Sequence, residues 1–465
     1  MYGLRWLAIL GVLLSVTLAT AQDGVQIPDG TPYAIGQPVM RDVYIDPENG
    51  DDNADGSAST PWRTLDYAWR QLPMGETLSQ GYRMILRAGD YSAENIPTYW
   101  ESRYGTADSP IILTSESGAD SVRLPNVNMF DVRYFYVLDI TMAGGGDVFH
   151  CERCDHLLLR GVTVIGDEPE TYNTQETIKI NQSQWVSIEN SDISGAWDNA
   201  LDAVAVQYGQ LIDSRIHNAG DWCTYVKGGS YGWYIGRNEF FDCGTGGVTA
   251  GQGTGFEFMT APWWTYEAAD ITITQNLIHD TEGAAFGVNG GDNILIANNI
   301  AYRVGARSHV LEVAHGLRSC DGDTEQCTLN QAAGGWGPTT VGVEMYIPSR
   351  RVHILNNVIE NPSGAPSQWQ QFFIAAPRTP APTADPARAD DGLVIAGNII
   401  INGSETHPLG IEDGGACADT NPTCNAAQLR RDNQINTLSR ALVDPENGDF
   451  RLLEGVELPP MPIIP

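Results

Sequence analysis

The sequence predicts an all-β protein, a right-handed single-stranded parallel β-helix with a short N-terminal capping helix and a C-terminal cover. Three observations predict this fold. An aliphatic residue, followed three positions later by Asn or Ser and two positions after that by an apolar residue, recurs about every 23 residues, a period typical of solenoids. Each repeat contains short segments rich in β-branched residues, as strands do. Gly, Asn and Asp separate these segments, as turn residues do.

The recurring polar position predicts a ladder of side chains along the helix axis. It is occupied by Ser191, Ser214, Asn238, Asn276, Asn357 and Asn398. Successive coils of a β-helix lie about 4.8 Å apart, so each amide can bind the next coil and tolerate left-handed backbone at the bend. Leucine-rich repeats and propellers are disfavoured, because neither the Leu pattern nor the Trp-Asp blade signature occurs.

The first 21 residues read as a secretory signal peptide. Arg5 precedes an apolar run from Leu7 to Leu18, and Ala19-Thr20-Ala21 fits a small-residue cleavage site. A membrane anchor is the alternative, but the run is short for a spanning helix, and no later segment reaches spanning length. We therefore expect a secreted or periplasmic protein.

Residues 22–84 are expected to hold a first strand and an amphipathic helix over Thr64–Leu72 that covers the open end of the solenoid. Asp51-x-Asn53-x-Asp55-Gly56 resembles the start of a calcium loop. Trp62 stands where such a loop requires Glu, which favours a structural turn over a calcium site.

The coils are expected over 85–405, with insertions at 243–268, 314–343 and 376–390, and residues 406–465 form a C-terminal tail. The first insertion carries Trp263, Trp264 and Tyr266. Sugar stacking on an exposed wall and burial against the coils are both open for these rings.

Eight cysteines agree with an oxidising compartment. Cys223 and Cys243 lie about one coil apart, so stacking brings them to disulfide distance. Zinc between His150 and His156 is the less favoured alternative for the CxxC pair. The predicted disulfides are Cys151–Cys154, Cys223–Cys243, Cys320–Cys327 and Cys417–Cys424.

The formal net charge of −32 argues against nucleic acid and anionic membranes as partners. It would also repel a polyanionic substrate unless a local cationic patch or a metal intervenes. The charge pattern alone describes a soluble protein with a solvated acidic surface, and we expect a monomer.

The segment from Tyr44 to Ala68, with Tyr44-Ile-Asp-Pro-Glu-Asn-Gly-Asp-Asp52 and Pro61-Trp-Arg-Thr-Leu-Asp-Tyr-Ala68, resembles the opening of secreted right-handed parallel β-helix proteins. These pectate-lyase-like proteins include the family 9 polysaccharide lyases. The resemblance covers most of the mature chain and implies a polysaccharide partner, but the fold hosts lyases, hydrolases, epimerases, esterases and adhesins. The paired-Asp motif of polygalacturonases and the Asp-Pro-His-Glu motif of alginate epimerases are absent.

Only two of the 26 basic residues are lysines, Lys179 and Lys227. Counting back from the recurring aliphatic residues Ile188, Leu211 and Ile235 predicts that Lys179, Asp202 and Lys227 stack on three consecutive coils. Glu257 is then expected on the next coil. Lysine can lose its proton where arginine effectively cannot. The pattern therefore favours a role that a guanidinium group cannot fill.

The resemblance implies β-elimination on a uronic-acid polysaccharide, in which calcium neutralises the substrate carboxylate and a lysine removes the C5 proton. Here Lys227 is the preferred base, and Lys179 is a second base or a carboxylate binder. Asp198, Asp202 and Asp221 are the candidate calcium ligands. The predicted substrate-binding residues are Arg237, Glu257, Arg303, Arg307, His309, Glu312, Trp263 and Trp264.

Two alternatives stay open. Lys179, Asp202 and Lys227 could form an ion ladder in a non-catalytic carbohydrate-binding or surface structural protein. A glycoside hydrolase could instead use Asp202 and Glu257 as its paired carboxylates. His217, His279 and His315 are expected to be turn or surface residues.

Overall fold

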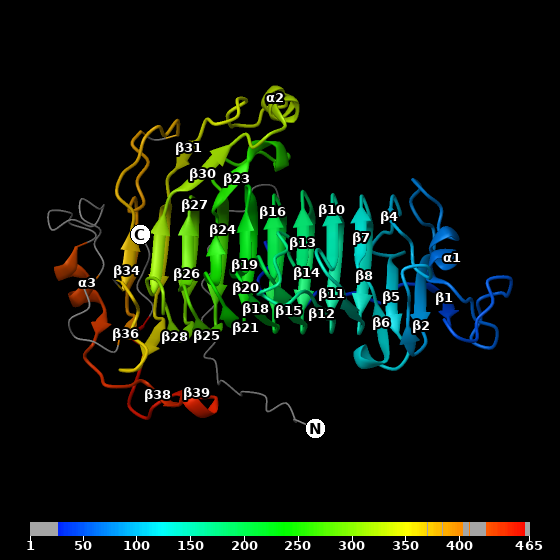
Figure 1. Cartoon of the computed structure of the whole chain (residues 1–465), viewed down its shortest axis with the longest axis horizontal. Coiled ribbons are helices and arrows are strands. Elements are labelled where there is room, and N and C mark those ends of the chain that lie inside the picture. The colour runs from blue at the N-terminus through cyan, green and yellow to red at the C-terminus, as the bar shows by residue number, and fades with distance from the viewer. Residues whose placement is uncertain (1–26, 370, 384, 403–408, 410–424, 461–465) are drawn as a thin grey trace.

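The computed structural model describes residues 27–369, 371–383, 385–402, 409 and 425–460 (Figure 1). Three long sheets of parallel strands run the length of the molecule, and each regular coil contributes one strand to each sheet in turn. This confirms the predicted right-handed parallel β-helix. We number the sheets 1 to 3 in the order in which a coil passes through them.

The strands of each sheet follow one another in chain order. Sheet 1 consists of β1 (Met40–Ile45), β2 (Gly81–Leu86), β5 (Ile111–Ser115), β8 (Arg133–Leu138), β11 (Asp155–Arg160), β14 (Gln184–Glu189), β17 (Gln207–Ile212), β20 (Ser230–Gly236), β24 (Ala268–Thr274), β27 (Gly291–Ala297), β32 (Arg350–Leu355) and β35 (Val394–Ala396). Sheet 2 consists of β3 (Gly89–Asp90), β6 (Val122–Leu124), β9 (Thr141–Ala143), β12 (Thr163–Ile165), β15 (Asp192–Ala196), β18 (Arg215–Ala219), β21 (Glu239–Cys243), β25 (Leu277–Thr281), β28 (Ile300–Val304), β33 (Val358–Asn361), β36 (Ile399–Asn402) and β37 (Gln434–Ile435). Sheet 3 consists of β4 (Trp100–Glu101), β7 (Val127–Phe130), β10 (Phe149–Glu152), β13 (Ile178–Asn181), β16 (Leu201–Val204), β19 (Trp222–Lys227), β22 (Gly246–Ala250), β26 (Ala284–Asn289), β29 (Leu311–Ala314) and β34 (Phe372–Ile374).

The remaining elements lie outside these sheets. They are the helices α1 (Leu65–Arg70), α2 (Thr324–Ala332) and α3 (Ala426–Asp432), the 3-10 turns η1 (Ala119–Ser121), η2 (Phe256–Phe258) and η3 (Pro445–Asn447), and the short strands β23 (Gly253–Gly255), β30 (Gly316–Ser319), β31 (Met345–Ile347), β38 (Leu442–Asp444) and β39 (Asp449–Leu452). Within the described residues, no helix is long and apolar enough to span a membrane.

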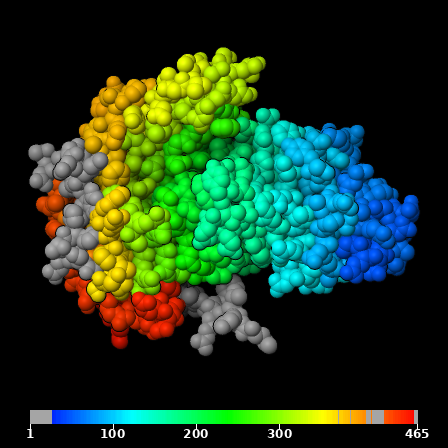
Figure 2. Space-filling model, in the orientation of Figure 1, coloured from blue at the N-terminus to red at the C-terminus, as the bar shows by residue number. Residues whose placement is uncertain are grey.

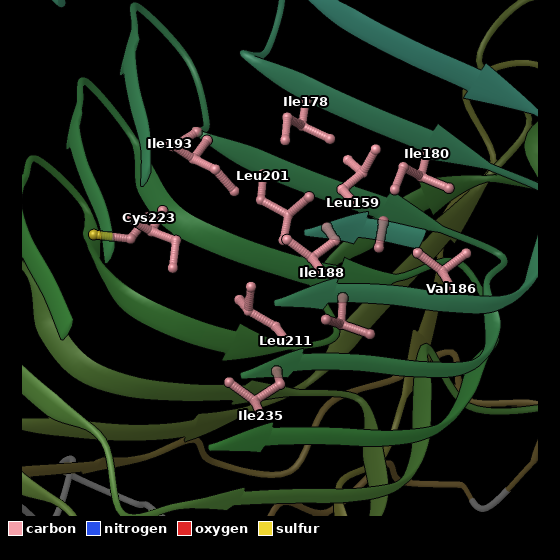
Figure 3. Packing of buried hydrophobic residues seen from close by; sticks show 14 of the residues in the cluster. Leu159, Ile178, Ile180, Val186, Ile188, Ile193, Leu201, Leu211, Cys223 and Ile235 are labelled. Atoms are coloured by element: carbon pink, nitrogen blue, oxygen red, sulfur yellow. The ribbon is translucent and has the colours of Figure 1, made fainter. Parts of the chain in front are cut away.

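Aliphatic side chains from all three sheets fill the interior of the coil stack. Leu159, Ile188, Leu211 and Ile235 stand at one register position on consecutive strands of sheet 1. Their side chains point inward with those of the neighbouring sheets (Figure 3), and they are fully buried. Burial of such columns is the main stabilising contribution to a solenoid.

The predicted polar ladder is present at the bend between sheets 1 and 2. The side-chain oxygen of each Asn accepts hydrogen bonds from the backbone N–H of the preceding rung, for example Asn299 from Asn276 at 2.9 Å. Its amide group donates to the next rung, as Asn299 does to Asn357 at 2.9 Å. The ladder therefore satisfies backbone groups that would otherwise be buried without partners.

The two ends of the stack are covered as predicted. Thr64 caps α1 by accepting from the N–H of Tyr67, and the helix buries Leu65, Ala68 and Trp69 in the core. At the other end α3 buries Leu429 in the same core. Asp51 and Asp55 accept hydrogen bonds from their own loop. These two carboxylates therefore stabilise the structural turn that the sequence favours.

A lead segment, residues 27–39, lies across the outer face of sheet 1. The carbonyl oxygen of Gly30 accepts from Arg237 at 2.9 Å, and that of Thr31 accepts from Gln210 at 3.1 Å. The hydroxyl of Tyr33 bonds to that of Tyr136 at 2.8 Å. The lead segment therefore runs along the outside of the stack, from the coil of β20 past β17 and β8 toward β1.

A second feature, the side module, comprises residues 252–266 and 315–348. It contains β23, β30 and β31, and it carries α2 outside the coils (Figure 1). In Figure 2 its α2 segment (yellow) projects from the coil surface. A fully buried ion pair, Arg318 to Glu267 at 2.8 Å, anchors the module to the coils.

Three predicted disulfides are confirmed. The Cα–Cα distances are 6.2 Å for Cys151–Cys154, 5.5 Å for Cys223–Cys243 and 6.3 Å for Cys320–Cys327. Because Cys151 and Cys154 are bonded to each other, the zinc alternative is excluded for this oxidised form. Cys417–Cys424, like the predicted signal peptide, lies outside the described residues.

Candidate functional site

The outer face of sheet 3 carries the candidate site. His150, Lys179, Asp202 and Tyr225 pair directly on consecutive strands β10, β13, β16 and β19. Because side chains alternate along a strand, the residue two positions further along also faces outward. Lys227 occupies such a position on β19, and it pairs with Val204.

The two lysines share one carboxylate. The Nζ atoms of Lys179 and Lys227 each lie 3.6 Å from Oδ2 of Asp202. Asp202 is 1% exposed, and among the described residues its Oδ1 has no hydrogen-bond partner. The predicted proximity of the two lysines is therefore confirmed.

The predicted straight stack of Lys179, Asp202 and Lys227 was wrong by two residues. Tyr225 occupies the position directly after Asp202. Tyr225 lies ten residues before Ile235, whereas Asp202 lies nine before Leu211. Lys227 lies only eight residues before Ile235, so it falls two residues beyond the expected position. The long lysine side chain nevertheless reaches Asp202 from the neighbouring column.

Lys179 also donates a hydrogen bond to Oε2 of Glu176, at 2.8 Å. Burial lowers the pKa of Lys179, but Asp202 and Glu176 outweigh burial and raise it above its ordinary value. Burial and the charge of Asp202 raise the pKa of Glu176 to about 8. At neutral pH Lys179 is therefore a fixed cation, and Glu176 is a carboxylic acid that can donate a proton.

Besides Asp202, Lys227 contacts uncharged side chains. Its Nζ lies 3.5 Å from Oε1 of Gln252 and 4.6 Å from the ring centroid of Tyr225. The Tyr225 hydroxyl donates to Asp221 at 3.1 Å and accepts from Gln252 at 2.6 Å. Gln252 begins the side module, so this insertion forms a wall directly beside Lys227.

The predicted calcium ligands lie on this face but do not form a cation cage as they stand. Asp198 and Asp221 lie just before β16 and β19, linked by a backbone hydrogen bond of 3.0 Å. Among the described residues, the oxygens of Asp198, Asp202 and Asp221 are not grouped within 4.8 Å of one another. Asp202 already contacts both lysine side chains, of which Lys179 is a fixed cation that would repel Ca²⁺.

Sequence reasoning missed three participants, Glu176, Tyr225 and Gln252. A signal for Glu176 was available, because an acid precedes four consecutive strands of sheet 3, at Asp147, Glu176, Asp198 and Asp221. No pattern in the sequence marked Gln252, since it lies in an insertion with no repeat.

Glu257 does not lie on the predicted coil. It lies in η2 of the side module, where its buried carboxylate accepts hydrogen bonds from the backbone N–H groups of Asp321, Gly322 and Asp323. Thr249, rather than Glu257, pairs with Tyr225 on the coil after it. The pairing of Asp202 with Glu257 as hydrolase carboxylates was therefore wrong.

Three predicted arginines lie away from the site. Arg237 lies on sheet 1, where it binds Asp213 and the lead segment. Arg303 lies on sheet 2, where it pairs with Asp280 at 3.0 Å. Arg307 lies in the turn after β28 and pairs with Glu282. The structure therefore does not bring these arginines together with the lysines.

Glu312 and His309 lie nearer the C-terminal end of sheet 3. The register runs from Tyr225 through Thr249 and Gly287 to Glu312, and burial raises the pKa of Glu312. His309 stacks on Phe373, with ring centroids 4.8 Å apart. Both flank the continuation of the face and do not contact the lysines.

The tryptophans of the first insertion anchor the side module. Trp264 stacks on Tyr231 with ring centroids 4.0 Å apart and donates to Gln207 at 3.1 Å. Trp263 packs against Phe256 and donates to the carbonyl of Ala333 at 2.9 Å. Both rings are half-buried and pack against the side module and the coils.

The three-sheet coil is that of a right-handed parallel β-helix. No protein-family model matches the chain, and no curated protein matches it. Among solved structures, the A-module of the mannuronan C-5 epimerase AlgE6 from Azotobacter vinelandii is 12% identical, with a TM-score of 0.43, over 71% of this chain and 88% of that one. A rhamnogalacturonan lyase is 11% identical, with a TM-score of 0.42, over 82% and 93%. The pectate lyase Pel9A is 15% identical, with a TM-score of 0.37, over 91% and 92%.

Proposed function

We propose that this protein is a secreted carbohydrate-active enzyme, a polysaccharide lyase that cleaves a uronic-acid glycan by β-elimination. The observation that carries the proposal is the sharing of one buried carboxylate by the only two lysines in the chain. One of them, Lys179, is held in its charged form by Glu176 and Asp202. The pair therefore places a fixed cation and a second lysine side chain on the same face of the helix.

In the proposed reaction Lys179 binds the uronate carboxylate and acidifies the neighbouring C5 proton. The reaction requires Lys227 to act as a free amine: its Nζ takes this proton, and the C5–H electron pair becomes the C4–C5 double bond. The bond from C4 to the glycosidic oxygen breaks, and the leaving oxygen takes a proton from Glu176, which is protonated below about pH 8. Since the transferred protons balance, no oxidant or water molecule is consumed.

Arginine would not serve in place of Lys227, because a guanidinium group keeps its proton. Asp202 orients both amines from a position where it is 1% exposed and does not contact solvent. It is therefore a positioning residue in this proposal. The three disulfides fit a protein that works outside the cytoplasm.

One observation favours a glycoside hydrolase as a second candidate. The pKa of Glu176, raised to about 8, suits a general acid, and Asp202 and Asp198 are carboxylates on the same face. Two carboxyl groups whose environments differ in this way are typical of glycosidases. In that reaction water is added, and both fragments are saturated sugars.

The experiment that tests the proposal is a screen of the purified protein against pectate, alginate, unsulfated chondroitin and neutral glycans. Each mixture is followed by the ultraviolet absorbance of unsaturated uronates and by the release of reducing ends. We expect both signals to rise together on a uronate-containing glycan. Reducing ends without absorbance would establish the hydrolase, and binding without either signal would establish a non-catalytic protein in which the lysines only stabilise the fold.

A further inference from the structure

The loop between β12 and β13, residues 166–177, presents an aromatic pair beside the candidate site. Tyr172 is 75% exposed, and its ring stands edge-on to that of half-buried Trp197, with centroids 4.8 Å apart at 73°. The loop is held in place by Asp167, whose carboxylate accepts from the N–H of Gly146 at 3.0 Å and from the amide of Asn173 at 2.8 Å. Burial in the core does not explain a ring this exposed.

Trp197 connects the aromatic pair to the carboxylates of the site. It directly precedes Asp198, whose carbonyl accepts from the N–H of Asp221 at 3.0 Å. Burial, and then the charge of Asp221, raise the pKa of Asp198. Aromatic faces next to a few convergent polar groups are typical of sites that bind small polar ligands such as sugars.

The charge around this pair selects against an acidic sugar. Asp147, Asp198 and Asp221 precede β10, β16 and β19 at one edge of the face, and the side-chain nitrogens of both lysines lie next to Asp202. A uronate fits at the lysines, but it would be repelled at Asp198 and Asp221.

We propose that Tyr172, Trp197, Asp198 and Asp221 form a subsite for an uncharged sugar residue. The substrate class that follows is a heteroglycan in which a uronate lies close to neutral or N-acetylated sugars, and not a homopolyuronate. This inference rests on the proposed function for the uronate at the lysines. The ring of Tyr172 stacks on the apolar face of the neutral sugar, and the two carboxylates accept its hydroxyl protons.

The test compares heteroglycans (hyaluronate, unsulfated chondroitin and a rhamnogalacturonan backbone) with polygalacturonate and polymannuronate. We expect a higher kcat/KM on at least one heteroglycan than on either homopolymer. Tyr172→Ala should raise KM on that heteroglycan about 3- to 10-fold, the range of one aromatic contact, and leave kcat within about twofold. Tyr172→Phe should restore KM, and Leu329→Ala, an exposed apolar residue on α2, is the matched control.

Equal kcat/KM on homopolymers and heteroglycans, or an unchanged KM in Tyr172→Ala, would overturn the subsite while leaving the lyase proposal intact. If no glycan gives unsaturated products, the proposed function fails, and the subsite is then tested by binding. Isothermal titration with hyaluronate and with xylan oligosaccharides should in that case show weaker binding for Tyr172→Ala than for Leu329→Ala. Equal binding by the two variants would overturn the subsite as well.

Discussion

The ammonium groups of Lys179 and Lys227 lie on the same wall of the helix, each 3.6 Å from Oδ2 of Asp202. Their roles in the proposed reaction differ, since one lysine only needs to be charged and the other must accept a proton. Conservative substitutions therefore separate the two roles.

We expect Lys227→Arg to lose at least about 100-fold in kcat, the lower range for a general base, because arginine keeps its proton. Lys179→Arg keeps the positive charge that binds the substrate carboxylate, and it should retain kcat within about 10-fold. Initial rates of unsaturated-product formation measure both. Equal losses in the two variants would show that the lysines act only as cations or as structural ions.

The pH dependence of activity should reflect Glu176. Its pKa of about 8 means that the acid is protonated at neutral pH and loses its proton, and with it its donor role, as the pH rises through 8. The wild-type kcat should therefore fall above about pH 8. Glu176→Gln should have a lower kcat and lack this fall, whereas Glu76→Gln, an exposed residue, should keep it. An alkaline limb that persists in Glu176→Gln would assign the ionisation to another group.

Chelation distinguishes calcium from lysine as the cation that neutralises the substrate. The resemblance to family 9 lyases predicts that calcium is required, whereas the proposed reaction gives this role to Lys179. We expect activity to survive excess EDTA within about twofold, on a substrate that does not itself gel with calcium. Full loss on chelation with recovery on added Ca²⁺ would show that substrate binding completes a calcium site at Asp198 and Asp221.

The stability of the protein should depend on pH through His279 on sheet 2. Burial lowers the pKa of His279, but its hydrogen bonds to Asp280 at 2.9 Å and Glu239 at 3.2 Å outweigh burial and raise it to about 9. A raised pKa means that the stabilisation is fully present below the unfolded-state value of 6.5 and is lost as the pH rises through about 9.

Denaturant unfolding of the wild type and His279→Gln from pH 6 to pH 10 checks this dependence. The difference in free energy of unfolding between the two proteins should shrink by about 1–3 kcal/mol over that range. Parallel curves would mean that the ring does not carry the charge. A second dependence at low pH is expected from Glu239, whose pKa the His279 hydrogen bond lowers to about 2 against the opposing effect of burial.

The polar ladder should be a large contributor to stability at each rung. Asn299 is 1% exposed and accepts from the backbone N–H of Asn276 at 2.9 Å. Asn299→Ala leaves that group buried without a partner and should cost about 2–4 kcal/mol in free energy of unfolding. Exposed Asn447→Ala should stay within about 0.5 kcal/mol. A loss below 1 kcal/mol for Asn299→Ala would show that water replaces the amide.

The sequence predicted the fold well because a solenoid repeats its constraints. Each Asn rung and each inward aliphatic residue had to recur at one spacing, so even a single sequence contains several independent copies of the same signal. The proximity of Lys179 and Lys227 followed from this period. The exact column did not, because the spacing to the strand of sheet 1 varies from coil to coil: Tyr225 lies ten residues before Ile235, whereas Asp202 lies nine before Leu211 and Lys227 only eight before Ile235.

Residues in the insertions could not be placed from the sequence. Glu257 is held by a contact with Asp321 of the second insertion, and Trp264 by a contact with Tyr231, which lies 33 residues earlier on β20. Arg237 was misassigned for a related reason. An outward-facing residue can lie on the outer face of any of the three sheets, and the repeat does not say which. The lead segment, which covers the outer face of sheet 1 next to Arg237, has no periodicity of its own.

The course of the lead segment bears on how the molecule unfolds. In an ordinary solenoid each coil contacts only its neighbours, so an end coil can detach while the middle survives. Here Tyr33 and Gly30 contact Tyr136 and Arg237, which are four coils apart along sheet 1. Separating any coil within that span requires the whole lead segment to be released, so these coils should unfold in a single cooperative transition. Cleavage of the lead segment by a protease should replace this transition with stepwise unfolding from the ends.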